Sequence, residues 1–374
     1  MKTPITDNQA RDFRAPGRVN LIGEHTDYND GFVMPAAIDL FVCVRLWPRE
    51  DRILEITSEN YNETVEFDLD QKDPKARKHW SDYAIGVAVM LERASHRLRG
   101  AHLQIRSEVP VGSGLSSSAA VEVATASALI ANANLKIDHR ELALLCQRAE
   151  NEFVGARVGI MDQFVVLFGQ AQQALMLDCR SLEFQLLPLP DTVNLVICNT
   201  MVKHELASSA YNERREQCEA GVRHLAQSLP HIKALRDVTS EELEQFGRDL
   251  PEVVYRRCRH VITENARVLA AAEALQHHHL RPFGQLMAES HKSLRDDYEV
   301  SSKELDVMVE LACRVDGVYG ARMTGGGLGG CTINIVQVEH VERFKDMVAR
   351  DYERFTGLKP EIYVCEASNG AEEI

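Results

Sequence analysis

The feature that most constrains the fold of this 374-residue chain is a glycine- and serine-rich segment, PVGSGLSSSAA, at residues 110–120. The segment before it, AHLQIRSEV from Ala101, is typical of a strand, and residues 117–132 predict a helix. The chain must therefore pass from a strand to a helix through a short loop that contains Gly112 and Gly114. Glycine allows positive φ angles and a close approach of the backbone to a ligand.

A junction of this kind is suited to bind phosphate. The first turn of a helix offers free backbone N–H groups and the positive end of the helix dipole to an anion. Serine hydroxyls at the mouth of the loop also contact phosphate or ligate Mg²⁺. The loop is not a Walker A motif, because the Gly-Lys-Ser/Thr ending is absent. The alternative is a flexible turn in which a serine only caps the helix.

A second glycine-rich segment, MTGGGLGGC at residues 323–331, connects two segments that are typical of strands. Five of its nine residues are glycine, which is more than a hairpin turn needs. Such a backbone is suited to contact a ligand or a neighbouring loop. The alternative is a glycine-rich hairpin or a bend required by packing.

Two acidic residues lie in apolar surroundings between these loops. Glu150 flanks the apolar stripe of a helix predicted over residues 138–153, and a carboxylate there is costly without a cation or hydrogen-bond donors. Mg²⁺ takes a carboxylate, a hydroxyl and phosphate oxygens together, and Glu150 with a loop serine would supply the first two. The alternative for Glu150 is a surface glutamate or an ion pair with an arginine. Asp162, in GIMDQF, is either a helix cap or a functional acid with a perturbed pKa.

The segment GRVNLIGEHTDY at residues 17–28 places polar residues directly after an apolar run. Arg18 precedes that run, and Glu24, His25 and Asp27 follow it. Taken alone, this pattern leaves a polar turn at the end of a strand as the alternative to a binding site.

The order of the predicted elements gives an α+β fold. Strands and helices mix in the first half, a mostly helical stretch covers residues 208–313, and strands return after it. This order does not match a regular βαβ array. The length predicts two domains with cores of their own, which we place at residues 1–185 and 186–374.

Composition and charge exclude several classes of partner. The net charge of −14 argues against nucleic acid or an anionic membrane as a partner, because these require clustered Lys and Arg. The nine cysteines show no metal-binding spacing, which favours free thiols in a reducing compartment. The first residues lack the apolar segment of a signal peptide, and no apolar run is long enough to span a bilayer. We expect a cytoplasmic monomer that binds small molecules.

The three segments together resemble the GHMP kinases, a superfamily named after galactokinase, homoserine kinase, mevalonate kinase and phosphomevalonate kinase. PVGSGLSSSAA resembles their phosphate loop and GARMTGGGLGGC their third motif. GRVNLIGEHTDYNDG resembles the signature of the galactokinase family, which the sister families do not share. The resemblance covers essentially the whole chain. It implies a two-domain fold of mixed sheets and helices, with the active site in the cleft between the domains.

The resemblance also implies an activity, the Mg²⁺-dependent transfer of the γ-phosphoryl group of ATP to the C1 hydroxyl of α-D-galactose. The products are ADP and galactose 1-phosphate, in the Leloir pathway of galactose metabolism. The resemblance assigns Arg18 and Asp162 as the catalytic pair, and Ser118 and Glu150 as Mg²⁺ ligands. The positions that it assigns to galactose are Glu24, His25, Thr26, Asp27, Gly159, Asp162 and Tyr211. The positions that it assigns to ATP are Trp80, near the adenine, and Gly112, Ser113, Gly114, Leu115, Ser116, Ser117 and Ser118.

The implied roles agree with the physics of phosphoryl transfer, in which positioning and charge stabilisation dominate. Asp162 would take the C1 proton as general base or act as an electrostatic anchor, and Arg18 would hold it ionised. Two alternatives stay open. One is a related sugar 1-kinase that acts on N-acetylgalactosamine or arabinose, and the other is a sensor that binds galactose and ATP without turnover.

Overall fold

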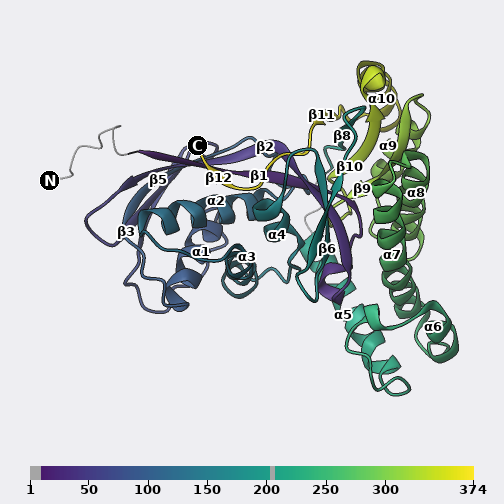
Figure 1. The fold of residues 1–374 in the computed structure, drawn as a ribbon, viewed down its shortest axis with the longest axis horizontal. Helices are drawn as coiled ribbons and strands as arrows, with labels where there is room; N and C mark the ends of the chain where they lie inside the picture. The colour runs from purple at the N-terminus through teal and green to yellow at the C-terminus, as the bar shows by residue number, and fades with distance from the viewer. Residues whose placement is uncertain (1–9, 203–206) are drawn as a thin grey trace.

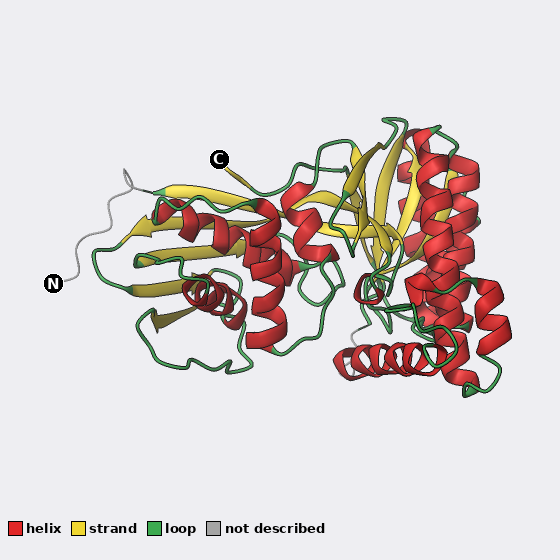
Figure 2. Ribbon diagram, turned by 60° about the horizontal axis from the view of Figure 1, so that its bottom comes forward, coloured by secondary structure: helices red, strands yellow, loops and turns green. Residues whose placement is uncertain are grey.

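The computed structural model describes residues 10–202 and 207–374. The prediction that the first residues lack a signal peptide therefore lies mostly outside the described residues. Figure 1 shows a large sheet and a small sheet arranged along the long axis of the molecule. Helices cover one face of the large sheet, and long helices of the second half lie against the small sheet (Figure 2). The mixture of sheets and helices confirms the predicted α+β class.

The large sheet contains both the first and the last strand of the described chain. Its strands are β1 (Arg11–Ile22), β2 (Phe32–Pro48), β3 (Ile53–Ser58), β4 (Glu63–Asp68), β5 (Ala101–Ser107), β6 (Gln173–Asp178), β7 (Phe184–Pro188) and β12 (Glu372–Glu373). Their order is β12-β1-β2-β5-β3-β4, with β6 beside β2 and β7 beside β6. The β3–β5 pair is parallel and the other pairs are antiparallel. The second half of β1 is fully buried, so the sugar signature begins at the end of a core strand.

The helices on the large sheet form the frame of the phosphate loop. They are α1 (Asp82–Arg93), α2 (Ser117–Asn132), α3 (His139–Arg148) and α4 (Met161–Phe168). The extent of the helix predicted over residues 138–153 is confirmed, but α3 ends at Arg148 and the last part is a π-helical turn, Ala149–Val154. In this turn the N–H groups of Gly155 and Ala156 both donate to the carbonyl oxygen of Glu150, at 2.9 and 3.0 Å. Single π-turns of this kind are frequent at functional sites.

The small sheet is antiparallel, with the order β11-β8-β10-β9. Its strands are β8 (Val193–Asn199), β9 (Val318–Thr324), β10 (Cys331–Gln337) and β11 (Glu361–Cys365). The helices of this half are α5 (Ala207–Leu225), α6 (Ser240–Phe246), α7 (Glu252–Gln276), α8 (Leu280–Asp296), α9 (Lys303–Cys313) and α10 (Val341–Thr356). Short 3-10 turns lie at η2 (Asp27–Asn29), η4 (Leu235–Asp237) and η5 (Val338–His340).

The chain passes from the large sheet to the small sheet between β7 and β8, close to the predicted boundary after residue 185. The end of the chain then returns, because β12 pairs with β1 through Glu373 and Phe13. Apolar residues of α7, such as Val268, join the core of the large sheet. The division into domains 1–185 and 186–374 stays a prediction. In the described part of the chain, no helix combines the length and the apolar character needed to cross a membrane.

Candidate active site

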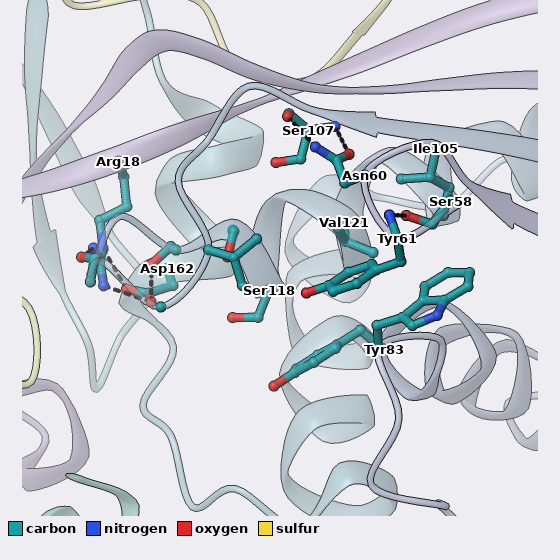
Figure 3. Close-up of a pocket in the computed structure, with 16 residues that line it drawn as sticks. Arg18, Ser58, Asn60, Tyr61, Tyr83, Ile105, Ser107, Ser118, Val121 and Asp162 are labelled. Carbon is teal, nitrogen blue, oxygen red and sulfur yellow. Dashed lines mark hydrogen bonds and ion pairs between the residues drawn. The ribbon is translucent and has the colours of Figure 1, made fainter. Parts of the chain in front are cut away.

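Arg18 and Asp162 lie 144 positions apart in the sequence and form a bidentate ion pair at one end of a cavity (Figure 3). Arg18 Nε and Nη2 donate to Oδ1 and Oδ2 of Asp162, each at 2.8 Å, and Ser116 Oγ also donates to Oδ2. The Arg18 side chain is 6% exposed and that of Asp162 is 25% exposed, so the acid retains access to the cavity. The cap alternative for Asp162 is wrong, because Ile160 occupies the N-cap position of α4.

The phosphate loop, residues 110–118, connects β5 to α2 with an unusual backbone. Gly114 and Ser116 have φ angles of 83° and 57°, in the left-handed region. Arg18 fixes the loop, because its Nη1 donates to the carbonyl oxygen of Gly114 and its backbone N–H to that of Leu115. Ser116 takes the N-cap position of α2 without a side-chain cap bond, so the serine-cap alternative is wrong. The first turn of α2 is therefore arranged to receive an anion.

The cavity beside the loop has a volume of about 360 Å³ and differs in character between its ends. Arg18 and Asp162 form the polar end, and the rings of Tyr61, Trp80 and Tyr83 line the other. Figure 3 shows Tyr61 and Tyr83 across the cavity from the ion pair. The Tyr61 and Trp80 rings are stacked with centroids 5.9 Å apart. The loop residues that line the cavity are Gly112, Gly114, Ser116, Ser117 and Ser118.

Two of the loop positions assigned to ATP lie inside the protein. Ser113 is 3% exposed, and its hydroxyl donates to the carbonyl oxygen of Pro110 at 2.7 Å. Leu115 is 1% exposed and belongs to the core of the large sheet. The side chains of Ser113 and Leu115 shape the loop. Any contact of these two residues with a nucleotide therefore has to come from their backbone groups.

Two buried glutamates share one amide group behind the loop. Gln163 Nε2 donates to Oε2 of Glu150 at 2.9 Å and to Oε2 of Glu122 at 3.0 Å. The hydroxyl of Ser118 also hydrogen-bonds to Glu150. Burial, and then the charge of Asp162, raises the pKa of Glu150 to about 7. Burial, and then Glu150, raises the pKa of Glu122 well above its usual range. The alternative of an exposed Glu150, or of an Arg–Glu150 ion pair, is therefore wrong.

Glu122 and Gln163 are site residues that the sequence did not predict. A signal was present for the first, because Glu122 is the single charged residue within residues 117–132. A carboxylate in an otherwise apolar helix is costly to bury, so its presence indicates a role at a site.

The oxygens of Ser118 and Glu150 suit Mg²⁺, a hard cation that takes one or two carboxylates, water and phosphate oxygens. The Oε1 atom of Glu122 is buried without a hydrogen-bond partner, so this region contains more acceptors than donors. A cation would balance that excess. No group of three or more His, Cys, Asp or Glu residues in the described ranges has the arrangement of a metal site. An ion at this position would therefore take its remaining ligands from nucleotide and water.

The sugar loop, residues 23–31, follows β1 and is held at its start by Glu24. Glu24 is 2% exposed; its Oε2 lies 2.7 Å from Arg322 Nη1 and accepts from Asn20 Nδ2 at 2.6 Å. Its Oε1 accepts from the N–H of Gly325 at 2.7 Å. Burial raises the pKa of Glu24 in spite of Arg322. Glu24 thus joins the sugar loop to the second glycine segment, and its contact with a sugar stays a prediction.

The structure brings together the other polar residues assigned to the sugar. A Cβ atom on Gly159 would lie 1.8 Å from Oδ2 of Asp27, so only glycine fits beside this carboxyl group. Burial, and then the charge of Asp162, raises the pKa of Asp27 to about 7. The ring centroids of Tyr211 and His25 lie 5.5 Å apart. Burial lowers the pKa of His25 to about 3. His25 is therefore neutral at pH 7.

Thr26 differs from its neighbours in the sugar loop. It is fully buried, and its hydroxyl lies 2.8 and 2.6 Å from the carbonyl oxygens of Gly23 and Phe32. A hydroxyl has one proton to donate, and here it is donated to a carbonyl oxygen of the protein at the ends of the loop. This geometry makes Thr26 a residue that shapes the loop, and its contact with the sugar stays a prediction.

The second glycine segment forms the hairpin turn between β9 and β10 and packs against the phosphate loop. A Cβ atom on Gly325 would lie 2.9 Å from the carbonyl oxygen of Gly114. A Cβ atom on Gly330 would lie 2.8 Å from that of Ser113. The interpretation as a hairpin and the interpretation as a contact with a neighbouring loop are therefore both confirmed.

Three family models match the chain. They are the GHMP kinases N terminal domain over residues 82–170, the galactokinase galactose-binding signature over residues 6–46 and the GHMP kinases C terminal domain over residues 271–354. A mevalonate kinase crystal structure shares the fold, with a TM-score of 0.67 at 18% identity over 96% of this chain and 99% of that one. The fold and the phosphate loop define a GHMP kinase.

Similar proteins show which family of GHMP kinases the chain belongs to. A galactokinase of Roseiflexus sp. (strain RS-1) is 49% identical over 96% of this chain and 91% of its own length, and one of Glaesserella parasuis serovar 5 is 44% identical over 95% and 93%. A crystal structure of Lactococcus lactis galactokinase complexed with galactose has a TM-score of 0.95 at 38% identity, over 98% of this chain and 96% of that one. The chain belongs to the galactokinase family and is an ATP-dependent sugar kinase.

We predict that Asp27 makes the stability of the free protein depend on pH. The folded protein holds a proton on Asp27 up to pH about 7, whereas the unfolded chain releases it near the ordinary value of 3.8. The free energy of unfolding should therefore decrease as the pH rises from about 4 to about 7. The Asp27→Asn variant should lose this part of the slope, which urea unfolding at several pH values measures.

The exposed Asp191 provides the control, because Asp191→Asn should retain the slope of the wild type. Parallel curves for the wild type and Asp27→Asn would contradict the prediction.

Proposed function

We propose that this chain transfers the γ-phosphoryl group of ATP to the C1 hydroxyl of α-D-galactose and releases galactose 1-phosphate and ADP. The observation that carries the proposal is the Arg18–Asp162 ion pair, which contacts the phosphate loop and lies close to Asp27 of the sugar loop. The galactokinase relatives, one of which is complexed with galactose, support this sugar as the acceptor.

In the proposed reaction, Asp162 accepts the proton of the C1 hydroxyl. The C1 oxygen forms a bond to the γ-phosphorus while the bond from that phosphorus to the β–γ bridging oxygen breaks, and ADP leaves with the electron pair. Arg18 holds both oxygens of Asp162, so the acid keeps its orientation toward the cavity. Because Arg18 also lines the cavity, its guanidinium lies where charge on the transferred group develops.

The phosphate loop is proposed to hold the nucleotide. Its backbone N–H groups and the first turn of α2 would contact the phosphates, and Trp80 with Tyr61 would contact the adenine. Ser118 and Glu150 would hold Mg²⁺, which when bound offsets the negative charge of the phosphate oxygens. The stacked rings of Tyr61 and Trp80 support an orientation in which the adenine lies at this end of the cavity and the phosphates lie at the loop.

The sugar loop is proposed to recognise galactose. The carboxylates of Glu24 and Asp27 would accept hydrogen bonds from adjacent hydroxyls, with Gly159 and Tyr211 beside them. The Nε2 atom of His25 is buried without a partner among the described residues, which leaves it for a sugar oxygen. The wrong epimer would leave a buried acceptor unpaired, at a cost of about 1–3 kcal/mol. Glucose should therefore be a poor acceptor.

We further propose that the chain works as a monomer in the cytoplasm, without nucleic-acid or membrane partners. The nine cysteines are free thiols, and the exposed Cys313 among them favours a reducing compartment.

A measurement of ADP release across a sugar panel tests the function. We expect galactose to have the highest kcat/KM, with glucose lower by at least about fivefold because an unpaired acceptor costs about 1–3 kcal/mol. A higher kcat/KM for N-acetylgalactosamine or arabinose would identify a related sugar 1-kinase. Binding of galactose and ATP without ADP release would identify a sensor. Either result would overturn the proposal.

Asp162→Asn should lower kcat by about 10²- to 10⁴-fold, because an amide cannot accept the C1 proton. ATP binding should change little, since the asparagine retains one side-chain oxygen that accepts from Arg18 or Ser116, and the Arg18 contacts with the backbone of the phosphate loop remain. Steady-state ADP release measures kcat, and intrinsic tryptophan fluorescence, to which Trp80 in the cavity contributes, measures ATP binding. Asp191→Asn serves as the control with unchanged turnover, and full turnover in Asp162→Asn would refute the catalytic role.

Glu150→Gln should raise the Mg²⁺ concentration needed for half-maximal activity by at least about tenfold, because an amide is a poor ligand for a hard cation. The matched control is Glu152→Gln. Glu152 lies in the same π-turn, but it is exposed and paired with Arg148. A Mg²⁺ titration of both variants separates the two positions, and identical curves would count against Glu150 as a ligand.

A further inference from the structure

Several residues of the sugar loop have backbone φ angles in the left-handed region. Gly23, His25 and Asp30 have φ angles of 103°, 64° and 57°. Non-glycine residues rarely take this left-handed region, and they remain there only where the surrounding structure holds them. A loop of this kind loses its shape when its external contacts are removed, so those contacts decide whether its polar side chains keep their positions.

Helix α7 supplies two of these contacts through buried side chains. Glu264 Oε1 accepts from the N–H of Gly23 at 2.9 Å. His260 Nε2 lies 3.1 Å from the carbonyl oxygen of Glu24. Because a carbonyl oxygen only accepts, Nε2 must carry the proton. Two side chains four residues apart, on one face of the helix, thus hold the backbone of two consecutive residues at the start of the loop.

The next residue of α7 holds the far end of the loop. Asn265 Oδ1 accepts from the N–H of Phe32 at 2.9 Å. A Cβ atom on Gly31 would lie 2.4 Å from the same oxygen, and one on Gly23 would lie 2.9 Å from Val268 Cγ2. The sugar loop therefore lies directly on α7 at both of its ends.

A second layer fixes the side chains of α7. Arg267 Nε donates to Oε2 of Glu264 at 2.7 Å, and Ser290 Oγ donates to Oε1 at 2.6 Å. Burial acts to raise the pKa of Glu264, but the surrounding charges and donors, Arg267 first among them, outweigh it and lower this pKa to about 2. Ser293 Oγ lies 2.9 Å from His260 Nδ1, which orients the imidazole. Glu264 and His260 are both fully buried.

We propose that α7 is the positioning element of the sugar site, in which His260 and Glu264 hold the sugar loop in its galactose-binding shape through the loop backbone. Both side chains contact the backbone of the loop, so both are positioning residues and not catalytic ones. The inference rests on the proposed function, because it takes the sugar loop as the galactose site. It goes further by assigning part of the sugar affinity to a helix more than 200 positions away in the sequence.

The test compares His260→Leu with His260→Gln. Leucine leaves the carbonyl oxygen of Glu24 unpaired, and we expect the dissociation constant and KM for galactose to rise about tenfold. The side-chain N–H of glutamine reaches the position of His260 Nε2, so His260→Gln should recover most of the loss. The ATP dissociation constant should stay within about twofold in both variants, because α7 does not line the nucleotide cavity. Calorimetry with galactose alone and tryptophan fluorescence with ATP measure the two affinities.

Glu273→Gln is the matched control, since Glu273 is exposed on the same helix and should leave both affinities unchanged. A folded His260→Leu variant with wild-type galactose affinity would overturn the inference. A parallel loss of galactose and ATP affinity would also overturn it, because that is the result of a purely structural role. If His260→Leu does not fold, the Ser293→Ala variant is used in its place. We expect it to lose galactose affinity to a smaller extent and to keep its ATP affinity. Unchanged galactose affinity in Ser293→Ala would overturn the inference.

Binding measurements on the wild-type protein distinguish a failure of this inference from a failure of the proposed function on which it rests. A wild-type protein that binds ATP but not galactose overturns the proposed function, and the inference falls with it. Galactose binding by the wild type, together with unaltered binding by folded His260→Leu, overturns the inference alone.

Discussion

The candidate active site depends on one cation, Arg18, because this side chain joins segments that are far apart in the sequence. Its guanidinium holds both oxygens of Asp162 on α4 and the carbonyl oxygen of Gly114 in the phosphate loop. Its own backbone is hydrogen-bonded to Leu115. One buried residue thus sets the distance between the loop proposed to hold ATP and the acid proposed to take the C1 proton. Positioning of this kind supplies a large part of the rate in phosphoryl transfer.

The acids around Arg18 explain why the site is suited to its ligands. Asp27, Glu122 and Glu150 are carboxyl groups whose pKa values are raised, in each case mainly by burial. Carboxylates removed from water are costly unless donors or cations satisfy them. Sugar hydroxyls are donors and Mg²⁺ is a cation, so both kinds of ligand would relieve a cost that the free protein carries. The same cost opposes stability, which is why the acids occur where ligands are expected to bind.

Features that depend on local chemistry could be predicted from the sequence. The glycine loop and the start of α2 at Ser117 were found as expected, because glycine and helix-entry signals act over a few residues. Tyr61 could not be predicted as part of the site, since only the pairing of β3 with β4 and β5 brings it to the cavity. The π-turn that buries Glu150 and the contact of His260 with the sugar loop also depend on packing. The roles of individual residues toward ligands stay predictions.

The two halves of the chain meet where the chemistry requires a fixed geometry. Gly327 and Gly329 of the hairpin turn have no room for a Cβ, which would lie 2.2 Å from the carbonyl oxygen of Val300 and 2.6 Å from that of Val202. The turn is therefore packed backbone to backbone against its own half, and through its other glycines against the phosphate loop. The same turn donates an N–H to Glu24 at the start of the sugar loop. The phosphate loop and the sugar loop thus share one neighbour, which fixes the position of one loop relative to the other.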